Sequence, residues 1–106
     1  MFEFKYLFRP INIVTINIYK NYAKLGYCSL NKNYLYNFNI YENYRGNGYS
    51  TILLNHTKDL NFKNYTNLQL HVEKSNQIAL NLYLKNGFKK KTTLNDIVLL
   101  EHSIIT

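Results

Sequence analysis

The amino-acid sequence predicts an α+β fold, in which helices pack on a mostly antiparallel and strongly twisted sheet. Three observations predict it: the residues before Tyr44 read as strands joined by short turns, helical spacing begins only after Gly48, and a strand and a closing hairpin alternate with the helices. The 106 residues are 46% hydrophobic, which is enough for one packed core. We therefore expect a single domain over residues 1–106.

The first half of the chain predicts a meander of strands. Isoleucines around Val14 predict a strand near 11–19, and a short strand near 2–8 precedes it. The next strand runs over 23–30, and residues 31–33 read as a hairpin turn. The residues that follow alternate with a period of two, which predicts a strand whose apolar face is formed by Tyr34, Tyr36, Phe38 and Ile40.

Glycines then mark the change from strands to helices. The turn around Gly46 and Gly48 ends the preceding strand and begins a helix that we expect over 51–60. A strand over 68–72 follows. Its leucines and valine face the core, so His71 points to the opposite face of the sheet.

A second helix and a hairpin complete the predicted fold. Ser75 is a suitable N-cap for a helix over 76–86, and Gly87 suits the position just after its end. Two closing strands are expected near 88–92 and 97–105. The predicted order is therefore meander, helix, strand, helix and hairpin.

The chain is basic. Its formal net charge is +7, from 13 Lys and Arg against 6 Asp and Glu. This balance suits an anionic partner, either nucleic acid or a phosphate-rich cofactor. The only basic run is Lys89 to Lys91, which is too short by itself to indicate nucleic-acid binding. A small RNA-binding domain is therefore the weaker interpretation.

Cysteine content and the N-terminus bear on the compartment. Cys28 is the only cysteine, so no intramolecular disulfide can form, and we expect a small core residue. The apolar stretch at the N-terminus contains charges and lacks a small-residue cleavage site, so it does not read as a signal peptide. No apolar run approaches the ~20 residues that a membrane span needs. We expect a cytoplasmic protein with no membrane partner.

The segment from Tyr44 to Ser50 has the most specific chemistry. Its glycines precede a helix, where exposed backbone N–H groups and the helix dipole favour a phosphate or pyrophosphate. A side chain at Gly46 or Gly48 would obstruct close approach to that backbone. The segment lacks the Gly-Lys-Ser/Thr ending of a P-loop, and it follows a meander rather than opening a βαβ unit. It is therefore neither a P-loop nor a Rossmann fingerprint.

A second block lies downstream and comprises Leu68 to Asn76, Ala79, Tyr83 and Gly87-Phe88. The two blocks together resemble the signature of the GCN5-related N-acetyltransferase (GNAT) superfamily. The pattern of that superfamily at the turn is Arg/Gln-x-x-Gly-x-Gly/Ala, and here Arg45 begins it while Ser50 takes the last small position. The resemblance covers residues 11–105 and implies a GNAT-like fold.

The resemblance also implies a cofactor site. Members of the superfamily use acetyl-coenzyme A as a cosubstrate, and no metal is expected. Their strand before the glycine turn parts from the strand that here contains His71. The pantetheine arm lies in that gap, and the pyrophosphate rests on amides that correspond to residues 46–51. The residues that the resemblance assigns to cofactor binding are Phe38, Asn39, Ile40, Arg45, Gly46, Asn47, Gly48, Tyr49, Ser50, Thr51, Asn76 and Tyr83.

Two residues receive catalytic roles from the same resemblance. The phenol of Tyr83 would donate a proton to the departing thiolate of coenzyme A. The string Leu-His-Val-x-x-Ser-Asn is similar to one branch, the protein N-alpha-acetyltransferases, in which a residue at the position of His71 is implicated in deprotonating the amine. Tyr34 roughly matches a tyrosine that helps to hold the catalytic water in some members. Glu42 and Glu73 are alternative bases.

The acceptor side departs from the family pattern. The first ten residues replace what is usually a strand plus a pair of helices, so we expect a domain that is truncated at the N-terminus. The branch resemblance implies direct acetyl transfer to the N-terminal amine of a protein or peptide. A small-molecule amine, a lysine and a non-catalytic coenzyme A-binding module are alternatives. The shortened side also suggests a homodimer or a partner subunit that completes the site.

Overall fold

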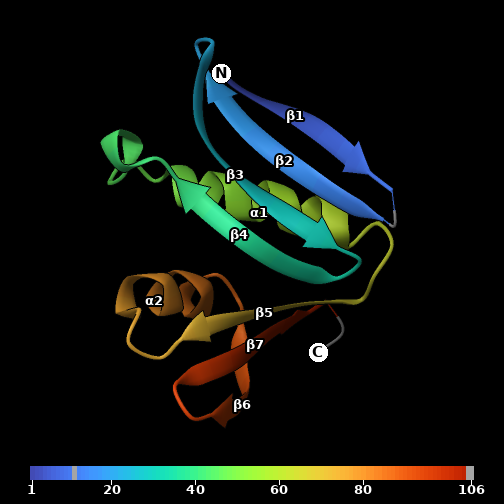
Figure 1. Cartoon of the computed structure of the whole chain (residues 1–106), viewed down its shortest axis with the longest axis vertical. Helices are drawn as coiled ribbons and strands as arrows, with labels where there is room; N and C mark the ends of the chain where they lie inside the picture. The colour runs from blue at the N-terminus through green and yellow to red at the C-terminus, as the bar shows by residue number, and fades with distance from the viewer. Residues whose placement is uncertain (11, 105–106) are drawn as a thin grey trace.

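The structure, a computed structural model, describes residues 1–10 and 12–104 and has the predicted α+β architecture (Figure 1). Its elements in order are β1 (Phe2–Arg9), β2 (Ile13–Lys20), β3 (Ala23–Asn31), β4 (Tyr34–Ile40), the short 3-10 helix η1 (Glu42–Tyr44), α1 (Tyr49–Asn61), β5 (Asn67–Glu73), α2 (Gln77–Lys85), β6 (Lys89–Leu94) and β7 (Ile97–Ser103). The seven strands form one sheet in the order β1-β2-β3-β4-β5-β7-β6. Neighbouring strands are antiparallel except for β4 and β5, which are parallel.

The N-terminal segment forms a complete β-strand. β1 pairs with β2 from Phe2, opposite Lys20, to Arg9, opposite Ile13. The connection between these strands spans only residues 10–12, so no helical pair separates them. The expected starting residue of the strand over 11–19 and the last residue of the strand over 97–105 lie outside the described residues. Over the described residues these two strands are observed as β2 (Ile13–Lys20) and β7 (Ile97–Ser103), so Asn12 and Ile104 lie outside them.

The core joins both helices to the sheet. α1 packs against β3, β4 and β5, whereas α2 packs against β5. Cys28 of β3 is fully buried, as predicted, and its Sγ lies 3.2 Å from Thr57 Oγ1 of α1. Burial raises the pKa of the Cys28 thiol to about 12, so this thiol is inert at neutral pH.

The predicted apolar face of β4 is wrong. Asn37 adopts φ 52, and the pairing of β4 with β3 shifts by one residue at this point. Leu35 and Ile40 are buried, whereas Tyr34 is only half-buried. Asn tolerates the left-handed region, so it can take the extra position of a β-bulge. The bulge reverses the inward and outward positions partway along the strand and breaks the period of two.

The caps of α2 confirm one prediction and correct another. Asn76, not Ser75, is the N-cap, and its side chain accepts a hydrogen bond from the Ala79 N–H at 3.2 Å. Asn is as good an N-cap as Ser, so local preference could not choose between two neighbouring candidates. At the other end Gly87 has φ 95, and the Phe88 N–H donates to the Tyr83 carbonyl at 3.1 Å. This is the Schellman geometry that favours glycine after a helix.

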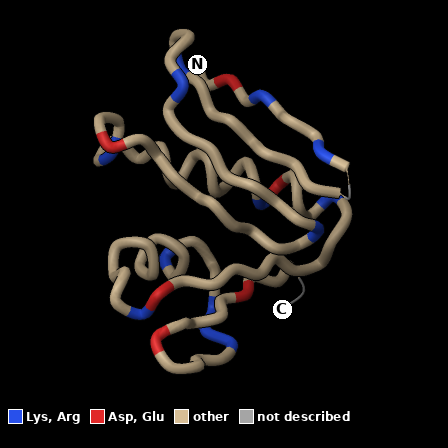
Figure 2. The backbone as a smooth tube through the Cα atoms, in the orientation of Figure 1, with Lys and Arg blue, Asp and Glu red and all other residues tan. Residues whose placement is uncertain are grey.

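Basic residues are distributed over the whole fold. Figure 2 shows them on strands, turns and helices, with the run Lys89 to Lys91 on the edge strand β6. Over the described residues, no helix combines the length and apolar character that crossing a membrane requires.

Candidate active site

Strands β4 and β5 meet at one point and then separate. Their pairing consists of Tyr34 opposite Gln69, and the Gln69 N–H donates to the Asn33 carbonyl at 2.9 Å. Figure 1 shows the two strands diverging toward their carboxyl ends. β5 instead pairs along its whole length with β7. The edge of β4 that faces the gap therefore presents backbone groups that no strand of the described sheet satisfies beyond the junction.

A cleft of about 590 Å³ occupies this separation. It is lined by β4, β5 and the first turns of α2, through Leu35, Tyr36, Asn37, Phe38, Leu70, His71, Val72, Glu73, Asn76, Ala79 and Tyr83. Four predicted site residues are thus brought together here: Phe38, His71, Asn76 and Tyr83. The residues from Arg45 to Thr51 do not line the cleft and lie beyond the end of β4.

The glycine turn presents an open helix N-terminus. Gly46 and Gly48 have φ 83 and 79, in the left-handed region that favours glycine. Gly48 is the N-cap of α1, which begins two residues earlier than expected. No side chain caps this helix in the described chain, and its first turn contains no acidic residue. The amides of the first turn are therefore available to an anion, and the helix dipole favours one.

The side chains of this turn stabilise the turn itself. Arg45 Nε donates to the Ile40 carbonyl at 2.8 Å, and its Nη2 donates to Asn39 Oδ1 at 3.0 Å. Asn47 Nδ2 donates to the Tyr44 carbonyl at 3.1 Å. These bonds fix the turn against the end of β4. In this arrangement the side chains of Arg45 and Asn47 support the turn, and its backbone amides are the groups that remain for an anion.

The side chain of Tyr49, the first residue of α1, packs against the sheet. Its ring packs edge-on against Phe2, with 5.6 Å between centroids, and Lys20 Nζ lies 5.6 Å from the ring centroid. The side chain therefore helps to attach α1 to β1 and β2.

Tyr83 lies on α2 at the wall of the cleft and is 7% exposed. Its ring makes edge contacts with Phe38 and Phe88, at centroid distances of 6.0 and 5.6 Å. Burial among these rings, and secondarily the Cys28 thiol, raise the pKa of the Tyr83 hydroxyl above its usual range. The phenol is therefore protonated at neutral pH, the form that a proton donor requires.

His71 projects from the exposed face of β5, as predicted, opposite to the buried Leu70 and Val72. Its Nδ1 lies 2.7 Å from the Tyr34 hydroxyl, within hydrogen-bond distance. When Nδ1–H donates to the Tyr34 oxygen, Nε2 has no proton and can accept one. In that tautomer His71 is suited to act as a base, whereas in the other tautomer the Tyr34 hydroxyl donates to Nδ1. The bond also gives Tyr34 a defined place beside His71.

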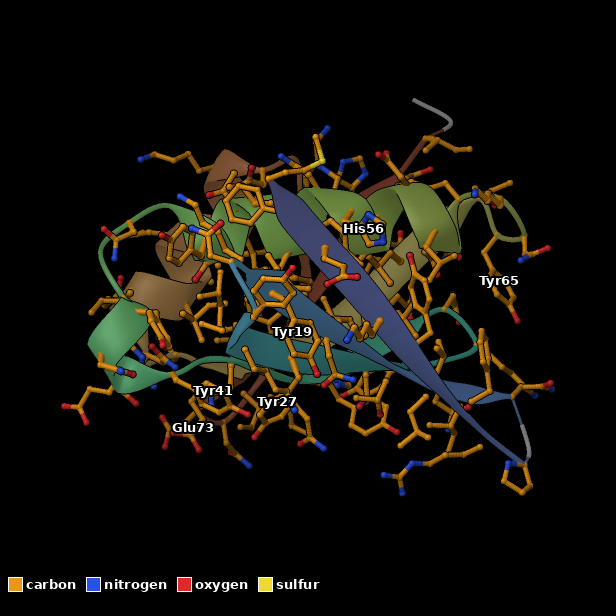
Figure 3. The ribbon with its side chains drawn as sticks, turned by 90° about the horizontal axis from the view of Figure 1, so that it is seen from above. Tyr19, Tyr27, Tyr41, His56, Tyr65 and Glu73 are labelled. Atoms are coloured by element: carbon orange, nitrogen blue, oxygen red, sulfur yellow. The ribbon has the colours of Figure 1, made fainter. Side chains whose placement is uncertain are left out.

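Glu73 was an alternative base, and the structure places it in the same cleft. It lies two residues after His71 on the same strand face. Figure 3 shows Glu73 on the side of the sheet opposite to His56, which lies on α1. Glu42 is exposed in η1 and does not line the cleft. Among the described residues there is no group of three or more His, Cys, Asp or Glu that could hold a metal ion.

Sequence reasoning missed several residues of the cleft, among them Tyr36 and Asn37. Both lie at the bulge of β4, where the strand turns its side chains away from the expected pattern. One signal was present in the sequence, since asparagine has a low preference for the interior of a strand. An Asn within an otherwise aromatic strand was therefore an indication of a bulge.

The sheet thus parts beside a helix N-terminus that no side chain caps, and such a terminus suits the phosphate of a ligand. The sequence profile of the acetyltransferase (GNAT) family matches residues 5–88. The chain therefore belongs to the GNAT family. No curated protein sequence matches the chain.

Solved structures share the fold. PaiA N-acetyltransferase from Thermoplasma acidophilum, in complex with coenzyme A, is 21% identical with a TM-score of 0.79, over 87% of this chain and 61% of that one. Spermidine N-acetyltransferase from Vibrio cholerae, in complex with coenzyme A and spermine, is 19% identical with a TM-score of 0.78, over 87% and 66%. IAA acetyltransferase from Bacillus cereus is 17% identical with a TM-score of 0.79, over 88% and 79%. The chain thus spans less than two thirds of the length of the first two proteins.

Proposed function

We propose that this protein is an N-acetyltransferase that takes its acetyl group from acetyl-coenzyme A and transfers it to a primary amine. One observation supports the proposal above the others. The parted strands place a buried phenol, Tyr83, and a histidine with a defined hydrogen bond, His71, in the same cleft. The open N-terminus of α1 lies beyond the end of β4, where it suits the pyrophosphate of the cofactor.

In the proposed reaction the acetyl group moves directly from sulfur to nitrogen. His71 Nε2 accepts a proton from the acceptor ammonium, which leaves a nucleophilic amine. The amine attacks the thioester carbonyl, the C–N bond forms, and the C–S bond then breaks. The Tyr83 hydroxyl donates its proton to the departing thiolate, and the second amine proton passes to solvent. Because Cys28 is buried and inert, no covalent enzyme intermediate is required.

The acceptor that we propose is the N-terminal amine of a protein or peptide. The motif around His71 supports it, as does the hydrogen-bonded pair of Tyr34 and His71. A small-molecule amine is the second candidate, because one of the solved structures with this fold is named a spermidine N-acetyltransferase. Tyr36 and Glu73, which line the cleft, are polar, and the carboxylate of Glu73 suits a cationic substrate of either kind.

An acceptor panel tests the proposal. The purified chain is incubated with acetyl-coenzyme A and one of three acceptors: a peptide with a free N-terminus, the same peptide with a blocked N-terminus and a lysine, or spermidine. Mass spectrometry of the acceptor and release of the coenzyme A thiol are the measurements. We expect product with the free N-terminus. Product only with spermidine would move the acceptor to the small-molecule class, and calorimetric binding without any product would indicate a binding module. The absence of both binding and product would contradict the proposal.

Replacing Gly48 with Val tests the phosphate site. Val is a β-branched residue that strains a backbone at positive φ, and its side chain would obstruct the amides of the first turn of α1. We expect the affinity for acetyl-coenzyme A to fall roughly ten- to hundredfold, the equivalent of one lost hydrogen bond to a charged group. Isothermal titration calorimetry measures the change.

Asn95→Val provides the matched control. Asn95 has φ 55 in the turn between β6 and β7, so Val introduces backbone strain at a residue that neither belongs to α1 nor lines the cleft. This variant should retain affinity even if it loses some thermal stability. Equal affinities for the wild type and Gly48→Val would remove the phosphate site from α1.

A further inference from the structure

The two edges of the sheet differ in how they are protected. Strand β6, at one edge, contains Lys89, Lys90 and Lys91, and its pairing with β7 is interrupted between Lys90 and Thr92. Lysines and bulges are the devices by which natural sheets prevent edge-to-edge pairing. Strand β1, at the other edge, pairs with β2 without any shift of register and has no proline within it. Strand β1 thus lacks the bulge and the lysine run of β6, and Lys5 is its one lysine.

Along strand β1, aromatic residues alternate with residues that are charged or aliphatic. Four aromatic residues alternate on the face toward α1: Phe2, Phe4, Tyr6 and Phe8. Phe4 stacks on His56 of α1, but Phe8 is 75% exposed, and Leu7 on the opposite face is 51% exposed. A long, regular and partly apolar edge strand is a template for another strand.

We propose that two copies of this chain associate through antiparallel pairing of their β1 strands, which forms one continuous sheet across a two-fold axis at Tyr6. In this register Glu3 of each copy lies opposite Arg9 of the other, and Phe4 lies opposite Phe8. The exposed Phe8 of one copy thereby gains an aromatic neighbour in the other. Such an interface is isologous, which is the commonest arrangement of homodimers.

The register follows from charge complementarity and overlap. In an antiparallel pair, two residues that lie opposite each other either both form hydrogen bonds to the other strand or both do not. When two copies of one strand pair, opposed residues are therefore an even number of positions apart, and the two-fold axis passes through a residue. An axis at Lys5 would place two lysines directly opposite each other, and like charges in that position destabilise a sheet. An axis at Phe4 would shorten the overlap. An axis at Tyr6 pairs most of β1. By symmetry it places Glu3 of each copy opposite Arg9 of the other, so that two acid–base pairs form. The one ion pair within the described chain joins Lys91 and Glu101, so neither Glu3 nor Arg9 is already engaged in one.

The proposed interface is separate from the cleft. β1 is three strands away from β4 in the sheet, and no residue of β1 lines the cleft. The dimer therefore neither rests on the proposed acetyl transfer nor requires it. Association should leave the binding of acetyl-coenzyme A unchanged.

Charge exchange tests the register. Sedimentation velocity over a wide dilution series, at about 0.15 M salt to limit long-range repulsion, measures the dimer dissociation constant. Glu3→Arg places two arginines opposite each other, and Arg9→Glu places two glutamates opposite each other. Each single variant should weaken the dimer by about tenfold or more, because two cross-strand pairs become repulsive. The variants shift the net charge in opposite directions, so a general charge effect could not weaken both.

Two further measurements complete the test. The double variant Glu3→Arg/Arg9→Glu should recover the wild-type dissociation constant, and an equimolar mixture of the two single variants should form heterodimers. Both residues are exposed, so folding is preserved, which circular dichroism verifies. A wild-type chain that stays monomeric at every concentration would overturn the proposal. A dimer whose dissociation constant is unchanged from the wild type in both single variants would overturn it as well, because its interface would then lie elsewhere.

Discussion

Tyr83→Phe is expected to lower kcat by roughly 10²- to 10⁴-fold, the usual contribution of a positioned general acid. The substitution removes only the hydroxyl and keeps the ring, whose edge contacts with Phe38 and Phe88 fill the wall of the cleft. Affinity for acetyl-coenzyme A should be nearly unchanged, because the hydroxyl acts on the leaving thiolate after binding. Steady-state kinetics and calorimetry together separate the two effects.

Tyr36→Phe is the matched control for this experiment. Tyr36 also lines the cleft, but it projects from β4, and no proton transfer is assigned to it. The loss of its hydroxyl should change kcat by much less. A Tyr83→Phe protein with wild-type kcat and a lowered melting temperature would show that Tyr83 serves core packing instead.

His71→Ala is expected to depress the rate at neutral pH by a similar factor, about 10²- to 10⁴-fold, because a general base is lost. In the wild type the rate should rise with pH as the imidazole loses its proton. The rate should rise rather than fall with pH, because a general base must be deprotonated and only the neutral imidazole accepts a proton. The variant should lose this dependence while its affinity for acetyl-coenzyme A is retained.

The acceptor amine also titrates, so the comparison must use one peptide for both proteins. Rates are measured from about pH 6 to 9, which spans imidazole and α-amino groups. Tyr34→Phe is an informative companion, since it keeps the imidazole and removes its 2.7 Å partner. Tyr34→Phe should lower the rate less than His71→Ala does. Identical profiles for the wild type and His71→Ala would rule out His71, and Glu73→Gln would then be the next variant to test.

Local sequence signals predicted most of the secondary structure. Glycines at positive φ, such as Gly48 and Gly87, occur where the backbone favours glycine, so Gly48 marked the start of α1 to within two residues and Gly87 marked the end of α2. The alternation in β5 placed His71 on the outer face. These features depend on a few neighbouring residues, and a sequence displays such residues directly.

Features that depend on distant segments were harder to predict. The bulge at Asn37 is stabilised by the pairing of β4 with β3, and the strand pattern alone did not show it. The contact between Tyr34 and His71 joins residues 37 positions apart across the junction of β4 and β5. Only the pairing of strands brings these two side chains together. For the same reason, the role of Tyr34 could be assigned only loosely from the sequence.

The single junction between β4 and β5 also links the stability of this protein to its occupancy. A ligand that lies along the open edge of β4 takes the position of a missing strand, and its amides can satisfy the backbone groups that face the gap. Binding then completes the sheet and joins its two halves. At a free ligand concentration 100 times the Kd, this linkage stabilises the folded state by about 2.7 kcal/mol. Without ligand the sheet is incomplete between β4 and β5. The melting temperature of the protein should therefore rise with the fraction of molecules that have cofactor bound.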